Sequence, residues 1–234
     1  MATFQNRVEA LTQFPFGANT DPSVAELTEF LKDGVHDVTN KTLEIDPREA
    51  EKFQRESSIV DSNGGFEVKG AKILSVMREG TADGSSDGST AWYPCRKIPA
   101  SLQSRVVDPD SLEYASIYNP VYTIIDYNKV HVYPVPDGTN DGFKVFYINN
   151  VPTDQTNGAS LIYSHSDIKY FPDEKVSLVV LYASIKTLEA LAGSKAIAQD
   201  TELVNSYASL ANSLKAEYNA AFQSQQPQQQ RQER

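Results

Sequence analysis

Cysteine and histidine are scarce in this sequence. Its 234 residues include one cysteine, Cys95, and three histidines. A single cysteine excludes a disulfide within the chain and a zinc site built from several thiolates. Arg96 and Lys97 follow Cys95, and neighbouring cations lower the pKa of a thiol. We nevertheless expect Cys95 to be a small packing residue at the end of a strand.

Long apolar runs are also missing. No stretch approaches the roughly 18 to 20 uninterrupted apolar residues that a membrane helix needs. Residues 1–6 lack the basic segment and following apolar run of a secretion signal. We therefore expect a soluble chain that is synthesised in the cytoplasm and contacts no membrane. Its composition, 40% hydrophobic and 22% charged, is typical of a globular protein with a substantial core.

Basic residues are outnumbered by acidic ones. The chain has 21 Lys and Arg against 31 Asp and Glu, which gives a formal net charge of −10. Tight binding of DNA or RNA depends on basic patches that displace counterions from phosphates. Because no run of basic residues here is longer than two, the sequence argues against tight nucleic-acid binding. An acidic surface can still line a path along which DNA must slide without sticking.

Patterns that carry catalysis or hold cofactors are few. His36 lies in a helical pattern and His131 in an alternating one, and we expect both to be ordinary surface or packing residues. The sequence has neither the spaced ligands of a zinc site nor a glycine-rich phosphate loop. The polar run at 83–88 lacks the alternating oxygen ligands and closing glutamate of a calcium loop. The sequence therefore predicts no catalytic residue, no cofactor and no metal.

One catalytic alternative stays open. His165 lies between Ser164 and Ser166, and a histidine can activate a serine hydroxyl as a nucleophile. Such a pair would make the chain a hydrolase. Adjacency in sequence does not create this geometry, so we expect a protein that is not an enzyme.

The first quarter of the chain, residues 1–57, is predicted to be helical. A short helix is expected over 4–13. A second begins at Pro22, because Asp21 or Thr20 can cap free amides and proline suits the first helical position. Its apolar residues recur every three or four positions up to about residue 38. A third helix is expected over 46–56.

The middle of the chain, residues 58–171, is predicted to be a β-rich insertion with connecting loops. The strongest signal lies at 118–151, where three runs of alternating apolar residues are separated by tight-turn compositions. Three strands joined in order by short turns form an antiparallel meander. The Gly- and Ser-rich segment 79–90 is expected to be a mobile loop, or a loop that orders against a partner.

The segment 172–224 is predicted to form an αα-hairpin that packs with the N-terminal helices. Its first helix, 174–192, is apolar over most of its circumference, which predicts burial on several sides by its own fold or by neighbouring subunits. Gly193 and Ser194 are expected to end this helix. The second helix carries an apolar stripe: Leu203, Tyr207, Leu210, Leu214, Tyr218 and Phe222.

These elements together predict an α+β fold. We expect a helical bundle with a long C-terminal αα-hairpin and an inserted antiparallel β-meander or small β-domain. The Gln-rich segment 225–234 is of low complexity and is expected to be disordered unless a partner holds it.

About half of the chain resembles a known family. The sequence reads Asn-Pro-Val-Tyr-Thr-Ile-Ile-Asp at 119–126, Lys-Val-His-Val-Tyr-Pro-Val-Pro at 129–136 and Phe-Lys-Val-Phe-Tyr-Ile at 143–148. Phe-Pro-Asp-Glu at 171–174 then precedes a Leu-, Val- and Ala-rich helix. These short motifs resemble the head-to-tail connector (adaptor, or neck) proteins of tailed bacteriophages.

The resemblance implies a structural role in the virion. Such subunits assemble as a ring, commonly of twelve copies, beneath the portal protein. The ring extends the channel through which the genomic DNA passes without specific binding, and it docks the tail or a second neck protein. The chain would then be made in the host cytoplasm and act in the neck of the virion. The alternative is another virion structural subunit: a tail terminator, a tail-tube-associated protein or a decoration protein.

The residues expected at the interfaces come from three places. The broad face of helix 174–192 predicts contacts with other copies, because a ring needs two different faces on each subunit. Tyrosine suits interfaces, since it combines a large ring with a polar tip. The resemblance implies that a terminal segment grips the portal or a neighbouring copy. The predicted interface residues are Val176, Val179, Val180, Ala183, Tyr133, Tyr147, Gln225, Gln226, Arg231 and Arg234.

Overall fold

The computed structural model describes residues 2–61, 65–68, 72–80, 91–126, 128–136, 142–148 and 151–223. It contains two compact units: a helical unit within Met1–Phe53 and Val151–Arg234, and a β unit within Gln54–Asn150. The predicted α+β class is confirmed. The sequence placed the insertion at 58–171, whereas residues 151–171 group with the helices.

The helical unit begins with α1 (Phe4–Thr12) and α2 (Val24–Ile45). The first turn of α2 is fixed by a capping box, in which Ser23 and Glu26 satisfy each other's backbone amides. Ser23, rather than the predicted Asp21 or Thr20, is therefore the cap. The helix extends beyond the predicted residue 38 to Ile45, and Thr39 and Thr42 continue its buried face.

A 3-10 helix, η1 (Pro47–Phe53), follows α2. The predicted α-helix over 46–56 is wrong in type and in length. The chain extends at Gln54–Glu56 as strand β1, whose three residues pair with β8 (Phe143–Ile148). Phe53 ends η1 in the core of the helical unit, with its ring edge-on to Phe171 at a centroid distance of 5.4 Å.

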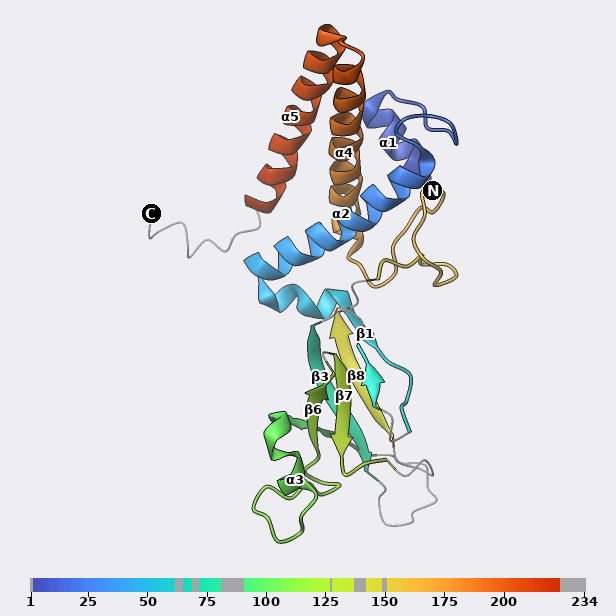
Figure 1. Ribbon diagram of the computed structural model, residues 1–234. Helices are drawn as coiled ribbons and strands as arrows, with labels where there is room; N and C mark the ends of the chain where they lie inside the picture. The colour runs from blue at the N-terminus through green and yellow to red at the C-terminus, as the bar shows by residue number, and fades with distance from the viewer. Residues whose placement is uncertain are drawn as a thin grey trace, which may run out of the picture. The chain divides into compact units, whose positions relative to one another are not determined.

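The second half of the helical unit is a helical hairpin. A 3-10 turn, η3 (Asp173–Lys175), leads into α4 (Val176–Ile197), and α5 (Thr201–Gln223) returns along it. The helix does not end at Gly193 and Ser194 as predicted, but continues through them to Ile197. Figure 1 shows α4 with α5 on one side and α1 on the other, while α2 crosses it, and α4 contacts all three.

The central position of α4 explains its apolar composition. The segment Asp173–Ile197 is long and apolar enough to cross a membrane by length and composition alone. Half of the 22 residues of α4 are buried in the helical unit. The buried hydroxyls of Ser184 and Thr187 donate to the carbonyls of Val180 and Ala183, each at 2.8 Å. We interpret α4 as a core helix whose polar groups are satisfied within the helix.

The β unit consists of two four-stranded sheets. Their strand orders are β1-β8-β3-β4 and β2-β7-β6-β5. A short α-helix, α3 (Gln103–Val106), follows η2 (Ala100–Leu102) in the connection between β5 and β6. The remaining strands are β2 (Phe66–Glu67), β3 (Ile73–Gly80), β4 (Ala91–Pro94), β5 (Arg96–Lys97), β6 (Val121–Ile125) and β7 (Lys129–Tyr133).

The predicted three-stranded meander is only partly correct. Strands β6 and β7 form an antiparallel hairpin, in register from Val121 opposite Tyr133 to Ile125 opposite Lys129. Strand β8 pairs with β1 and β3 in the other sheet and not with β7. Both sheets contribute to one core, formed by Val68, Val76, Tyr122, Val130, Val132, Phe143, Val145 and Tyr147. The chain therefore changes sheets after β7, as in sandwich folds.

Candidate interaction surface and a polar cavity

The four residues of α4 that the sequence placed at an interface are buried inside the helical unit. Val176, Val179, Val180 and Ala183 are all buried. Gly34 of α2 lets the two helices approach closely, because a Cβ built there would lie 3.3 Å from a methyl group of Val179. The helical unit itself therefore buries these four side chains, and their contact with other copies stays a prediction.

The two tyrosines predicted at an interface are also core residues, of the β unit. Tyr133 packs in a small cluster with Val121, and its hydroxyl accepts a hydrogen bond from the side-chain amide of Gln103. Tyr147 is buried with its ring 5.7 Å from that of Phe66. Their place at an interface likewise stays a prediction. The other predicted contacts lie outside the described residues: Gln225, Gln226, Arg231, Arg234 and the loop beyond Gly80.

The stripe predicted on α5 divides into a covered half and an open half. Leu214, Tyr218 and Phe222 are buried in the helical unit. Leu203 and Leu210, on the same stripe, are each 38% exposed. Ile197, in the last turn of α4, is 88% exposed. We call Ile197, Leu203 and Leu210 the hairpin surface, because these exposed apolar side chains all belong to the α4–α5 hairpin.

The covered half of α5 is tied to α2 by polar contacts. The Tyr218 hydroxyl donates to the Asp37 carboxylate at 2.5 Å, and the Lys41 ammonium lies 2.8 Å from the same oxygen. Lys41 also lies 4.7 Å from the Tyr218 ring centroid and 5.8 Å from that of Phe222. Burial and the hydrogen bond to Asp37 raise the pKa of Tyr218. The end of α5 is therefore fixed beside residues 37–41.

His165 has a structural role in the helical unit. Its backbone carbonyl and that of Tyr163 accept from the free amides of Phe4 and Gln5 at the start of α1, at 2.8 and 3.0 Å. The ring Nδ1 accepts from the Ile162 amide at 3.2 Å. The same Nδ1 lies 3.7 Å from the Asp154 carboxylate. Because Nδ1 accepts the hydrogen of the Ile162 amide, it does not donate to this carboxylate as the histidine of a catalytic triad does. This geometry does not favour the hydrolase alternative.

Cys95 is a poor nucleophile in this environment. Burial raises the pKa of its thiol to about 12, against a smaller opposing effect of the Arg78 guanidinium. Because the thiolate is the reactive form, the adjacent cations in the sequence do not activate this residue. Burial likewise lowers the pKa of the His131 imidazole, while His36 is half-buried on α2. Among the described residues, no group of three His, Cys, Asp or Glu side chains could hold a metal ion.

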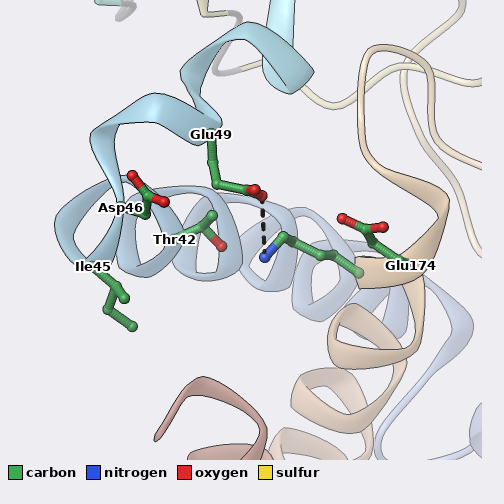
Figure 2. A pocket seen from close by; sticks show the side chains of 6 residues that line it. Thr42, Ile45, Asp46, Glu49 and Glu174 are labelled. Carbon is green, nitrogen blue, oxygen red and sulfur yellow. Dashed lines mark ion pairs between the residues drawn. The ribbon is translucent and has the colours of Figure 1, made fainter. Parts of the chain in front are cut away.

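A polar cavity of about 360 Å³ opens where α2, η1 and η3 meet. Figure 2 shows Glu49 reaching into it from η1, with Thr42 and Asp46 on one side and Glu174 on the other. The cavity is lined by Thr42, Ile45, Asp46, Glu49, Glu174 and Lys175.

Ion pairs link the charges around this cavity. The buried Lys175 ammonium lies 3.6 Å from Glu49 Oε2. Lys52 bridges Glu49 and Glu174, at 2.9 and 2.8 Å. The hydrogen bond to Lys52 lowers the pKa of Glu174. Sequence reasoning missed this site, because its residues come from two stretches far apart in the sequence, 42–49 and 174–175, and form no motif.

No protein-family model matches the chain, and no curated protein matches it.

Proposed function

We propose that this chain is a virion structural protein without catalytic activity: a head-to-tail connector subunit that assembles as a ring beneath the portal. The motifs at 119–148 and 171–174 support this proposal, because they resemble those of connector proteins. A helical unit with an inserted β unit is also what that resemblance implies. In the ring the chain would extend the DNA channel and dock the tail.

The observation that carries the proposal is the open half of the α5 stripe. Leu203 and Leu210 continue a stripe whose other half is fully buried, yet each remains 38% exposed. Burial of apolar surface contributes a favourable free energy of about 25 cal/mol for each Å² removed from water, and exposed apolar side chains lack this contribution. A second copy of the chain packing on the hairpin surface would recover this energy. Head-to-tail contacts of this kind close into rings.

The acidic charge suits a subunit beside a DNA channel. A net charge of −10 repels phosphates. DNA would then slide past the ring without the counterion release that stabilises protein–DNA complexes. The proposed partners are therefore other copies of the chain, the portal and a tail or second neck protein.

The test is assembly in the presence of the portal. The purified chain is mixed with portal rings and measured by native mass spectrometry and electron microscopy. A ring of chains stacked on the portal is expected. Rings that form but ignore the portal would favour the alternative of another virion structural subunit. A monomer that neither self-assembles nor binds portal would overturn the proposal.

A further inference from the structure

The ring of His165 lies between a hydrogen-bond donor and an acceptor. Its Nδ1 accepts the hydrogen of the Ile162 amide at 3.2 Å. The same nitrogen lies 3.7 Å from Oδ1 of Asp154. A backbone amide can only donate and an ionised carboxylate can only accept, so the protonation of Nδ1 decides between the two partners. The neutral ring bonds to Ile162, whereas a protonated ring would donate to Asp154.

The Asp154 carboxylate is fixed beside the imidazole. Asp154 is buried, and its Oδ2 accepts from the backbone amides of Thr156 and Asn157 at 3.0 and 3.1 Å. These two hydrogen bonds hold the carboxylate with Oδ1 on the side of His165. A buried carboxylate gains from a cationic donor, because a charge-assisted hydrogen bond offsets the loss of its hydration. A protonated His165 is such a donor.

The other charged groups of this segment are engaged elsewhere. The Asp167 carboxylate accepts from the amide of the next residue at 2.8 Å, and the Lys169 ammonium lies 5.1 Å from the centroid of the following tyrosine ring. Helix α2 meets the segment through the Thr28 hydroxyl, which accepts a backbone amide at 3.3 Å. Helix α1 meets it through the amides at its start. Within the described part of the chain, neither helix forms an ion pair with the His165 ring, which leaves Asp154 as its charged partner.

The start of α1 depends on the same segment. The amides of Phe4 and Gln5 donate to the carbonyls of His165 and Tyr163 at 2.8 and 3.0 Å. The first amides of a helix have no partner within the helix, so these two carbonyls attach α1 to the segment. The His165 amide also donates to the Ile162 carbonyl at 3.1 Å, so backbone and ring together close the turn between these residues. A change at the ring therefore acts on the turn that carries both carbonyls.

We propose that His165 makes the attachment of α1 dependent on pH. Protonation breaks the hydrogen bond from the Ile162 amide and forms one from Nδ1 to Asp154. The turn at 162–165 then opens, and the carbonyls that hold the start of α1 shift with it. Histidine is the side chain that ordinarily changes its charge between about pH 5 and 8, so mild acid would act as the signal. This inference concerns the helical unit of a single chain and is independent of the proposed ring.

The experiment is amide hydrogen exchange of the full chain at about pH 8 and about pH 5. Protection factors remove the intrinsic pH dependence of exchange, and the chemical shifts of the ring nitrogens report the protonation of His165 in the same samples. At the lower pH we expect a protonated ring and protection at Ile162, Phe4 and Gln5 that is roughly fivefold lower, the effect of losing one hydrogen bond. A ring that stays neutral, or unchanged protection around a protonated ring, would overturn the proposal.

The variant His165→Asn separates the charge of the ring from its position. Asparagine offers an oxygen acceptor close to the place of Nδ1 but does not titrate, so the hydrogen bond from Ile162 should persist at both pH values. Protection at Phe4 and Gln5 should then no longer depend on pH. The matched control is His36→Asn on α2, which should leave the pH dependence as it is in the unmodified chain.

Two further outcomes would count against this role. An undiminished pH dependence in His165→Asn would assign the effect to other groups and overturn the role of His165. In the unmodified chain, a change of protection confined to Ile162 would overturn the link to α1.

Discussion

Tyr218 of α5 donates its hydroxyl hydrogen bond to the carboxylate of Asp37 on α2, at 2.5 Å. The two residues are 181 positions apart in sequence, so the contact joins the last described helix to the first long one. Lys41 satisfies the same carboxylate oxygen from one turn further along α2. This contact belongs to the covered half of α5, which is part of the core. We assign the open half to assembly.

Removal of that hydroxyl should weaken the helical unit. Tyr218→Phe keeps the ring and its packing on Phe222, but leaves Asp37 with one partner fewer. We expect the free energy of unfolding to fall by about 1.5–3 kcal/mol, the usual range for a hydrogen bond to a charged group. Chemical denaturation measures it. Tyr207→Phe, on the open half of α5, is the control and should change the value by less than about 0.5 kcal/mol. Equal effects would contradict the division of α5.

The same hydroxyl makes stability depend on alkaline pH. The pKa of Tyr218 is raised above its ordinary value of 10.0 in the folded chain. A raised pKa contributes stability that is complete below the unfolded value and is lost as pH rises above it. The free energy difference between the unmodified chain and Tyr218→Phe should therefore shrink above pH 10, by up to about 1.4 kcal/mol per pH unit. Denaturation at pH 9 and 11 tests this, and a constant difference would contradict it.

Cys95 should be nearly inert while the chain is folded. With a pKa of about 12 instead of 9.0, its thiolate fraction at pH 8 is about a thousandfold smaller. Alkylation by iodoacetamide should be at least roughly 100-fold slower in the native chain than in denaturant. Ser209→Cys on the exposed side of α5 is the control for reagent access. Rapid alkylation of Cys95 in the native chain would contradict the burial of its thiol.

The α4 valines should behave as core residues of a single chain. Val179→Ala removes two buried methyl groups and leaves a cavity, so we expect a loss of about 2 kcal/mol of unfolding free energy. The loss should be the same at low and high protein concentration. A loss of unfolding free energy that grows with protein concentration would instead indicate that Val179 lies at an interface between copies.

Local patterns predicted the helices better than the sheets. The capping chemistry around residues 21–26 and the periodic stripe of α5 act over a few neighbouring positions, so they can be recognised along the sequence. The partner of a strand is a non-local choice. Alternation in 143–148 identifies a strand, but not that it pairs with β1 and β3. The break expected at Gly193 and Ser194 does not occur, since α4 continues through both residues to Ile197. A single glycine lowers the stability of a helix by only about 1 kcal/mol, which is too little to end it.

The candidate surfaces were harder to predict than the fold. An apolar face such as that of α4 must be covered, but its sequence does not reveal whether the cover is another helix or another copy. The structure answers this for Val179, which is fully buried. The cavity at Thr42 could not be predicted for a different reason: its lining comes from two distant stretches, 42–49 and 174–175, which only the tertiary fold brings together.

The hairpin surface can be tested without losing the fold. Leu203→Ser with Leu210→Ser replaces two exposed side chains, so the free energy of unfolding of the single chain should change by less than about 1 kcal/mol. Self-assembly should weaken by at least roughly tenfold, because two apolar contacts between copies are removed. Leu214→Ser, in the covered half, is the contrasting variant and should unfold the helical unit.

Native mass spectrometry of the unmodified chain and of the Leu203→Ser, Leu210→Ser variant, each mixed with portal rings, tests the central claim most directly. The account predicts a closed ring of chains on the portal for the unmodified protein, and dispersed single chains for the variant. A single chain that stays alone beside the portal in both samples, or a ring that forms equally well in both, would contradict it.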